Sequence, residues 1–387
     1  MSGSGRTFDP AGRSFAPGSR VPITPIDRRR ELGPLDVTET LRGKNLLIVG
    51  GTGFLGKVLV GMLLARFPDV GHIYLMVRGK GKMSPKERFE QELWPTPCFD
   101  PLRNTYPLEK LYEKLTPIPG DVVEPRAGIR DDVLAQLRAA RIDCLLNVAG
   151  VVSFDPPLDE GLRVNAIGVL NLLQLCRDLA HDDVAPAPAQ SQKAWDDEAN
   201  ASFVGAADSI MPAPVASSNA ANPGRAVPLL HTSTCYVAGG RTGTIWEDDP
   251  RITPFPYALA GDDRSALDRA HWDPKRELDE GLAIAKHLRE RATDAQMQSQ
   301  FLARAKQKLR DLDRPTTGEP LAQALKKEHD KFIDDELGDA GMKRAKHWGW
   351  PNTYTYTKSI GEQLLASSGQ PFTIVRPAIV EASIEFP

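Results

Sequence analysis

The residues best suited to chemistry are Tyr354 and Lys358, which lie four positions apart in the run Tyr-Thr-Tyr-Thr-Lys. Positions four apart share one face of an α-helix, so both side chains could act on one substrate atom. The phenol would supply a proton, and the ammonium would lower the pKa of the phenol from its free value near ~10. This spacing indicates protonation of an oxygen such as that of a carbonyl. Tyr356 would face away from Lys358.

A glycine-rich run between Gly50 and Gly56 is the second chemical feature. It follows an apolar run and opens a helical pattern, which is the context that a dinucleotide-binding turn requires, although similar runs also form purely structural turns. Gly51 and Gly53 would let the backbone approach a pyrophosphate at a helix N-terminus. The predicted cofactor contacts are Gly50, Thr52, Gly53, Phe54, Leu55 and Gly56. With the Tyr-x-x-x-Lys pair, the turn predicts a nicotinamide-dependent reductase.

The second predicted strand ends in a basic loop that bears on cofactor choice. NAD enzymes usually place an acidic residue there to hold the ribose hydroxyls. This chain has Arg78, with Lys80 and Lys82 close behind, while Asp69 lies before the strand. A guanidinium could bind a 2′-phosphate through two hydrogen bonds, so the loop predicts NADPH. A solvated basic loop is the alternative.

Three further strand ends contribute candidate residues. Asp121 could accept a hydrogen bond from the adenine amine or simply cap a turn, and Ala149 and Gly150 should lie beneath the ribose and nicotinamide. Thr234 closes the fifth strand, where its hydroxyl could donate to the same oxygen as Tyr354. Its neighbour Ser233 competes for that role, since successive strand residues face opposite sides.

The other residues that often do chemistry offer less. His231 lies in an apolar strand and is interpreted as a core residue with satisfied hydrogen bonds. No metal-ligand spacing occurs. Four scattered cysteines suggest buried thiols rather than disulfides.

Apolar runs that suit buried strands alternate with helical patterns along the chain. The alternation favours an α/β class with a doubly wound parallel sheet, a Rossmann fold, whose ligands bind beyond the carboxyl ends of the strands. The expected strands are 45–49, 71–77, 115–119, 142–148, 227–231 and 372–375. The expected helices between them are 54–67, 84–93, 131–139 and 160–180.

Three segments depart from this alternation. Residues 1–36 are expected to be a disordered tail, which leaves 37–387 as the reductase domain. Residues 183–226 are rich in Ala, Ser, Pro and Asn, as is typical of a flexible loop. Residues 250–346 are dense in charge and keep apolar positions at helical spacing. They indicate a helical insertion before Tyr354, either a lid over the sheet edge or a solvated hairpin with no role in binding.

Composition limits the class of protein. The chain has 387 residues, of which 41% are hydrophobic and 26% charged, as in ordinary soluble globular proteins. Its net charge of -3 gives no reason to expect nucleic-acid binding. No secretory signal is visible, and the longest apolar stretch, 46–67, contains Lys57 and several glycines. We therefore expect a cytoplasmic protein, with peripheral membrane contact and oligomeric state left open.

With these residues considered, the chain resembles the extended short-chain dehydrogenase/reductases and, more narrowly, the alcohol-forming fatty acyl-CoA reductases with their male-sterility-type NAD-binding domain. The resemblance spans about residues 40–387, apart from the two insertions. Its more specific parts are the run from Trp348 to Glu362 and the pair Arg376-Pro377. Further matches are Gly43-Lys44, the glycine turn, the Arg78 loop, Lys86-Glu87-Arg88, Gly120-Asp121, Val152-Ser153-Phe154-Asp155, Asn165 and His231-Thr232-Ser233-Thr234.

The resemblance implies that Thr234, Tyr354 and Lys358 are catalytic and that Asn165 assists the helix beside the site. It implies hydride transfer from NADPH to a long-chain fatty acyl-CoA, release of CoA, and further reduction of the aldehyde to a fatty alcohol. Family members continue past the sixth strand into an acyl-binding region, so a truncated substrate region is expected here. The alternatives are a reductase of thioesters bound to a carrier protein and a catalytically silent NADP(H)-binding fragment.

Overall fold

The computed structural model describes residues 35–105, 107–180, 226–240 and 272–380, together with two short antiparallel strands, β1 Thr7–Phe8 and β2 Ser14–Phe15. The rest of the predicted tail before residue 35 lies outside the described residues. So do the predicted loop 183–226, except for its last residue, and the part of the predicted insertion before residue 272.

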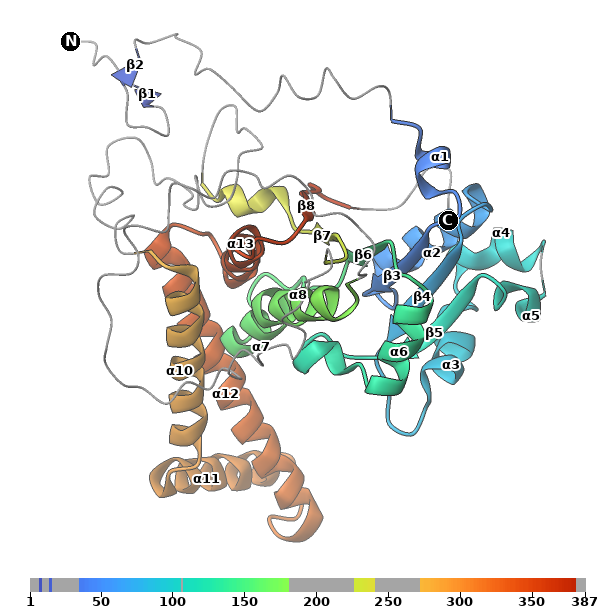
Figure 1. Ribbon diagram of the computed structural model, residues 1–387. Coiled ribbons are helices and arrows are strands. Elements are labelled where there is room, and N and C mark those ends of the chain that lie inside the picture. Colours follow the sequence, from blue (N-terminus) through green and yellow to red (C-terminus); the bar gives the residue numbers. More distant parts are fainter. Residues whose placement is uncertain are drawn as a thin grey trace.

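A six-stranded parallel sheet forms the centre of the molecule, with the strand order β5-β4-β3-β6-β7-β8 (Figure 1). The strands are β3 Asn45–Val49, β4 His72–Val77, β5 Leu115–Pro119, β6 Cys144–Asn147, β7 Leu229–Thr232 and β8 Phe372–Val375. From β3 the chain builds the sheet first toward β5 and then, starting at β6, toward β8. The predicted doubly wound Rossmann fold is thereby confirmed, and in folds of this kind the ligand binds beyond the ends of the strands where the order reverses, here β3 and β6.

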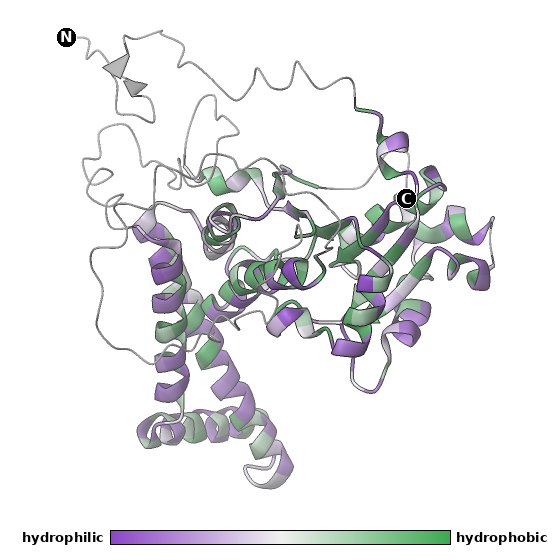
Figure 2. Ribbon diagram, viewed as in Figure 1, coloured by the Kyte–Doolittle hydropathy of each residue, from purple (hydrophilic) through white to green (hydrophobic). Residues whose placement is uncertain are grey.

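Helices cover both faces of this sheet. Leu46 and Ile48 of β3 pack on the side of α2 Phe54–Arg66, whereas Leu47 and Val49 pack on the side of α6 and α8. Figure 2 shows the strands mostly in hydrophobic colours, as expected for a sheet buried on both faces. The helices of the second face are α6 Asp131–Ala139 and α8 Gly168–Asp178. The shorter helices are α1 Val37–Leu41, α3 Pro85–Arg88, α4 Asp100–Arg103 and α5 Leu108–Leu111.

Two predicted helices contain a π-helical turn. The helix predicted over 160–180 consists of α7 Leu158–Leu162, a π turn at Arg163–Ile167, and α8. The helix predicted over 84–93 is α3 followed by a π turn at Phe89–Leu93. Such turns are frequent at functional sites, and the first of them contains the buried Asn165.

The described part of the insertion consists of three helices: α10 Pro274–Ala292, α11 Ala295–Asp311 and α12 Gly318–Trp348. Their residues are mostly hydrophilic (Figure 2). Leu278 of α10 and Ala345 of α12 join an apolar cluster with Leu162 of α7 and Ile360 of α13 Thr353–Ala366. The outer parts of α10 and α12, with α11, extend away from the sheet (Figure 1). The insertion is therefore anchored on α13, the helix with Tyr354 and Lys358.

Among the described residues, no helix is both long and apolar enough to span a membrane. The same residues contain no cluster of three or more potential metal ligands. All four cysteines are unpaired, and Cys98 and Cys176 are buried.

Candidate active site

The glycine-rich turn joins β3 to α2 next to the end of β6. Gly50 has a φ of +89°, and a Cβ there would lie 2.4 Å from the backbone nitrogen of Ala149. A Cβ on Gly56 would lie 2.2 Å from the carbonyl oxygen of Gly50. Only glycine fits at these two positions, because the backbones of the turn, α2 and β6 approach so closely.

The N-terminus of α2 is suited to a phosphate. Its N-cap, Gly53, offers no side-chain hydrogen bond to the first N–H groups of the helix. Those groups and the positive end of the helix dipole favour an anion. Phe54 is exposed, while Thr52 and Leu55 are half-buried, so the predicted contacts remain accessible. A backbone cradle that a side chain would fill, together with an uncapped helix N-terminus, fits the pyrophosphate of a dinucleotide.

Two residues predicted to bind the adenosine end of the cofactor lie side by side. Arg78 follows β4 and Asp121 follows the neighbouring β5, and their side chains are 3.7 Å apart from Nη1 to Oδ2. The Arg78 side chain remains 69% exposed. Lys80, by contrast, forms an ion pair with Glu92 at 2.7 Å. Arg78 and Asp121 therefore lie together at the strand ends, whereas Lys80 is paired with Glu92 instead.

The loop after β6 connects the cofactor turn with Lys358. The backbone N–H of Ala149 donates to Oδ1 of Asn147 at 3.0 Å, which fixes the start of this loop. A Cβ on Gly150 would lie 2.9 Å from Nζ of Lys358, so the amine lies directly against this glycine. Nζ itself donates to the carbonyl oxygen of Thr232 at 3.0 Å.

Tyr354 is held in the first turn of α13. The helix is capped by Asn352, whose side chain accepts from the backbone N–H of Thr355 at 2.9 Å. The N–H of Tyr354 donates to the carbonyl oxygen of Phe154 at 3.1 Å. Its hydroxyl lies close enough to the side chain of Thr234, which is buried just after β7, for Thr234 to lower its pKa. The structure therefore brings the predicted Thr and Tyr hydroxyls together.

Ser233, the competing candidate, directly precedes Thr234. It is buried, and its Oγ has no hydrogen-bond partner among the described residues. Thr234, not Ser233, is thus the residue that interacts with Tyr354.

Burial has the largest effect on the pKa values of both Tyr354 and Lys358. It raises the pKa of Tyr354 above the ordinary 10.0, and the nearby side chain of Thr234 opposes this effect. It lowers the pKa of Lys358 from 10.5 to about 8, while Glu362 acts in the other direction. The expectation that the ammonium lowers the pKa of the phenol is therefore wrong for this structure, because burial disfavours the phenolate more strongly. Near neutral pH Tyr354 is a protonated phenol, which can donate a proton.

Residues 48–185 and 216–385 match the model of a family described as "Male sterility protein". The chain belongs to this family. The family model is that of an NAD-binding domain, so a nicotinamide dinucleotide is the class of cofactor for this site.

The curated relatives of this male sterility domain are named as reductases. "Fatty acyl-CoA reductase 1" of Arabidopsis thaliana is 29% identical over 355 residues, which cover 90% of this chain and 53% of the relative. The "Alcohol-forming fatty acyl-CoA reductase" of Simmondsia chinensis is 24% identical over 361 residues, covering 91% of this chain and 54% of the relative. The chain thus spans about half the length of the relatives it matches.

Among solved structures, one similar chain is the terminal R domain from the myxalamid PKS-NRPS biosynthetic pathway. It is 17% identical, with a TM-score of 0.41, and the match covers 87% of this chain and 49% of that chain.

Asn165, assigned a supporting role by resemblance, joins two parts of the site in this male sterility domain. Its Oδ1 accepts from the backbone N–H of Val151 at 3.2 Å, and its Nδ2 donates to the hydroxyl of Thr357 at 3.0 Å. The loop after β6 and α13 are therefore held together from within the π turn.

Three residues to which the sequence reasoning gave no role also support the site. Arg376, after β8, donates to both carboxylate oxygens of the buried Glu362 at 2.9 and 2.5 Å. Glu362 follows Lys358 by four positions, so helical spacing alone could have identified it. The ring of Phe154 meets that of Tyr354 edge-on, with centroids 6.4 Å apart. That contact crosses between distant segments and has no signal in the sequence.

His231 and Tyr356 do not belong to the group formed by Thr234, Tyr354 and Lys358. Burial, and then the charge of Lys358, holds the pKa of His231 well below its usual 6.5, so the imidazole is neutral. Its Nδ1 lies 3.0 Å from Nδ2 of Asn147, and its Nε2 has no partner in the described part of the chain. The hydroxyl of Tyr356 donates to Glu277 of α10. His231 is a core residue, as expected, although only one of its nitrogens is hydrogen-bonded there.

Proposed function

We propose that this domain reduces long-chain fatty acyl-CoA thioesters to fatty aldehydes and on to fatty alcohols, with NADPH as the reductant and release of CoA. The observation that supports this most directly is the proximity of the Thr234 and Tyr354 side chains, with Lys358 one helical turn from Tyr354 and its amine against Gly150 of the cofactor site. The names of the relatives supply the substrate class.

The cofactor would be held by the glycine cradle, the N-terminus of α2 and the loop at Gly150. NADPH supplies a hydride for the thioester carbon. Arg78 supports NADPH over NADH, because its exposed guanidinium stands at the end of β4, where NAD enzymes usually have an acidic residue. Asp121 keeps this guanidinium close to the strand ends.

The reacting oxygen would lie between the hydroxyls of Tyr354 and Thr234. The neutral phenol of Tyr354 would give its proton to the oxygen as hydride reaches the carbon, and Thr234 would donate a hydrogen bond that stabilises developing negative charge there. The resulting hemithioacetal would then lose CoA as a thiol, because its C–S bond breaks and its hydroxyl proton passes to sulfur, which leaves the aldehyde. Lys358 adds positive charge beneath the site when it is protonated, and its hydrogen bond to Thr232 fixes the amine in place. The same groups would serve the second reduction, with a second NADPH and a reprotonated Tyr354, because the aldehyde presents the same carbonyl oxygen.

The test follows NADPH oxidation with palmitoyl-CoA and identifies the products by gas chromatography. We expect aldehyde and alcohol from the unaltered chain, and at least a 100-fold lower rate for Tyr354→Phe, since general acid catalysis contributes roughly 100- to 10,000-fold. The affinity for NADPH should stay unchanged in the variant. Binding of NADPH without turnover would contradict the proposal in favour of a silent module. Turnover only with palmitoyl-acyl carrier protein would assign the reaction to carrier-bound thioesters instead.

A further inference from the structure

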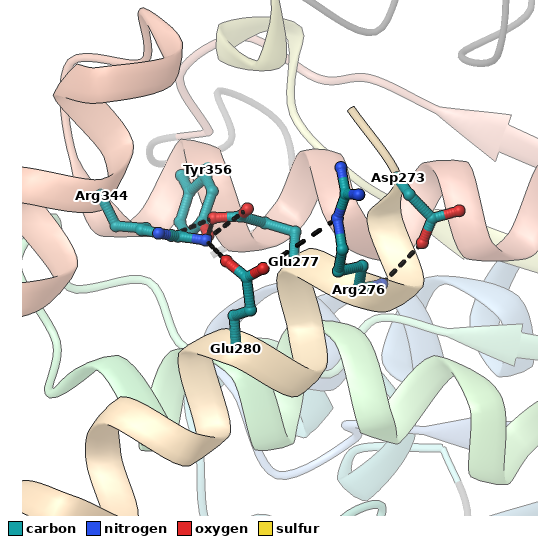
Figure 3. A network of polar contacts seen from close by, with 6 residues as sticks. All are labelled: Asp273, Arg276, Glu277, Glu280, Arg344 and Tyr356. Atoms are coloured by element: carbon teal, nitrogen blue, oxygen red, sulfur yellow. Dashed lines mark hydrogen bonds and ion pairs between the residues drawn. The ribbon is translucent and has the colours of Figure 1, made fainter. Parts of the chain in front are cut away.

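The helical insertion meets the catalytic helix α13 through a buried polar network (Figure 3). Tyr356, two residues after Tyr354, donates its hydroxyl to the carboxylate of Glu277 on α10. Arg344 of α12 donates to both oxygens of the same carboxylate, with 2.8 Å from Nη2 to Oε2. Both Glu277 and Tyr356 are buried, so α10, α12 and α13 share one desolvated contact.

Each member of this network depends on the others. A buried carboxylate is costly unless it is paired and hydrogen-bonded, and Glu277 has the guanidinium of Arg344 and the phenol of Tyr356 as its donors. Arg344 also donates to Glu280, one turn further along α10. Since Tyr356 donates to a carboxylate, its hydroxyl has a defined position, and the position of α13 follows from it.

A second contact joins the insertion to the segment with Thr234. Trp350 lies between α12 and α13, and its indole N–H donates to the carbonyl oxygen of Val237 at 2.9 Å. Val237 belongs to the 3₁₀ turn that begins directly after Thr234. The Trp350 ring also packs on Tyr356, with centroids 5.8 Å apart. The elements that hold both catalytic hydroxyls are therefore attached to the same end of the insertion.

The helix backbones at this junction are too close to slide freely. A Cβ on Gly341 of α12 would lie 2.5 Å from the hydroxyl oxygen of Thr353, the first residue of α13. A Cβ on Gly281 of α10 would lie 2.6 Å from a methyl carbon of Leu162 in α7. Such close packing transmits small displacements between helices.

We propose that Tyr356 is a positioning residue, which holds α13 through Glu277 and Arg344 so that Tyr354 and Lys358 face the reacting carbonyl. The insertion is thus part of the catalytic apparatus, and the alternative of a solvated hairpin without a role does not apply to its inner end. The kinetic part of this proposal rests on the reductase function proposed above; the structural part does not.

The test compares Tyr356→Phe with Tyr112→Phe. Phenylalanine keeps the ring contact with Trp350 and removes only the hydroxyl. Tyr112 is the matched control, because its hydroxyl also donates to a carboxylate, that of Glu90 at 2.8 Å, on the opposite part of the molecule. Three quantities are measured: kcat with palmitoyl-CoA, the Kd for NADPH, and hydrogen–deuterium exchange of the peptide covering 353–366.

For Tyr356→Phe we expect kcat to fall about tenfold to 100-fold, since a misplacement of about 1 Å can cost roughly 100-fold. The Kd for NADPH should change less than about twofold, because no cofactor contact is removed, and exchange within 353–366 should be at least about tenfold faster. Tyr112→Phe should leave all three quantities unchanged. A wild-type kcat and wild-type exchange in Tyr356→Phe would overturn the proposal, and so would equal losses in both variants.

The exchange measurement needs no substrate, so it separates this proposal from the reductase function. If the unaltered chain does not reduce palmitoyl-CoA, the proposed function fails while faster exchange in Tyr356→Phe still supports the positioning role. If Tyr356→Phe does not fold, Trp350→Phe tests the second contact in the same way. Wild-type exchange of the peptide covering 353–366 in Trp350→Phe would then overturn the proposal.

Discussion

Replacing Lys358 by Met should make this protein more stable at neutral pH while abolishing its activity. Burial lowers the pKa of Lys358 from 10.5, its value in an unfolded chain, to about 8 in the folded protein. The unfolded chain therefore binds this proton more tightly, so folding carries the full penalty below about pH 8 and loses it only as the pH rises to about 10.5. Each unit of difference corresponds to about 1.36 kcal/mol, so the penalty at pH 7 is on the order of 3 kcal/mol.

The net gain is smaller than this penalty. Methionine is similar in length and has no charge, so the penalty disappears, but the carbonyl oxygen of Thr232 loses a donor, at a cost of about 1 kcal/mol. Glu362 keeps its two bonds from Arg376 and is not left unpaired. Lys358→Met should thus be about 2 kcal/mol more stable at pH 7.

The pH dependence supplies the decisive measurement. Between about pH 8 and 10.5 the folded protein loses the proton before the unfolded chain does, so the stability of the unaltered protein rises through that window. By pH 9.5 its remaining penalty is about 1 kcal/mol, which the lost hydrogen bond in the variant offsets. Urea denaturation at pH 7 and 9.5 should show a higher midpoint for the variant only at pH 7, with an unchanged slope.

The control is Lys343→Met, which removes an exposed lysine of α12 and should show no such difference between the two pH values. A Lys358→Met midpoint at or below that of the unaltered protein at pH 7 would refute the reasoning. An advantage of equal size at both pH values would refute it too, because the gain would then not come from a titrating amine.

Two further substitutions test the cofactor site. Gly56→Ala should abolish dinucleotide binding and cost about 1–3 kcal/mol of stability, since its methyl would lie 2.2 Å from the carbonyl oxygen of Gly50. The control is Gly338→Ala in α12, where an added Cβ would meet no other atom within 4 Å. This substitution should instead raise the free energy of unfolding by up to about 1 kcal/mol, as measured by urea denaturation. Arg78→Ala should raise the Kd for NADPH about tenfold to 100-fold and leave that for NADH unchanged, as fluorescence titration would show; equal losses for both cofactors would contradict the assigned role of Arg78.

The sheet could be predicted well because its signals are local. The apolar runs at 45–49, 115–119 and 372–375 coincide with β3, β5 and β8, and the other three strands differ by only a few residues. The proximity of Arg78 and Asp121 also follows from the fold, because β4 and β5 are neighbours in a parallel sheet. Each residue was proposed on its own, because each follows a predicted strand. The fold brings their side chains into contact.

Contacts between distant segments could not be read from the sequence. The periodicity of α13 showed that Tyr356 faces away from Lys358 but not what it would meet. Its partner, Glu277, lies 79 positions earlier in a charged helix where acidic residues are common. The sequence also predicted a lowered pKa for Tyr354, whereas burial raises it in the structure. The spacing of residues reveals the nearby lysine but not the extent of burial. Burial depends on how the loop with Phe154 covers the first turn of α13.

The enclosure of α13 limits how the insertion can move. Most of its side chains are buried, including polar ones such as Thr357 and Gln363. A helix buried on all sides needs partners for its polar groups. Thr357 accepts a hydrogen bond from Asn165 in the π turn between α7 and α8. Tyr356 donates one to Glu277 in α10 of the insertion. Breaking a buried ionic contact of this kind costs about 3–5 kcal/mol. The inner ends of α10 and α12 are therefore tied to the same buried core as Tyr354, which leaves α11 and the outer parts of α10 and α12 as the described part of the insertion that a lid motion would have to use.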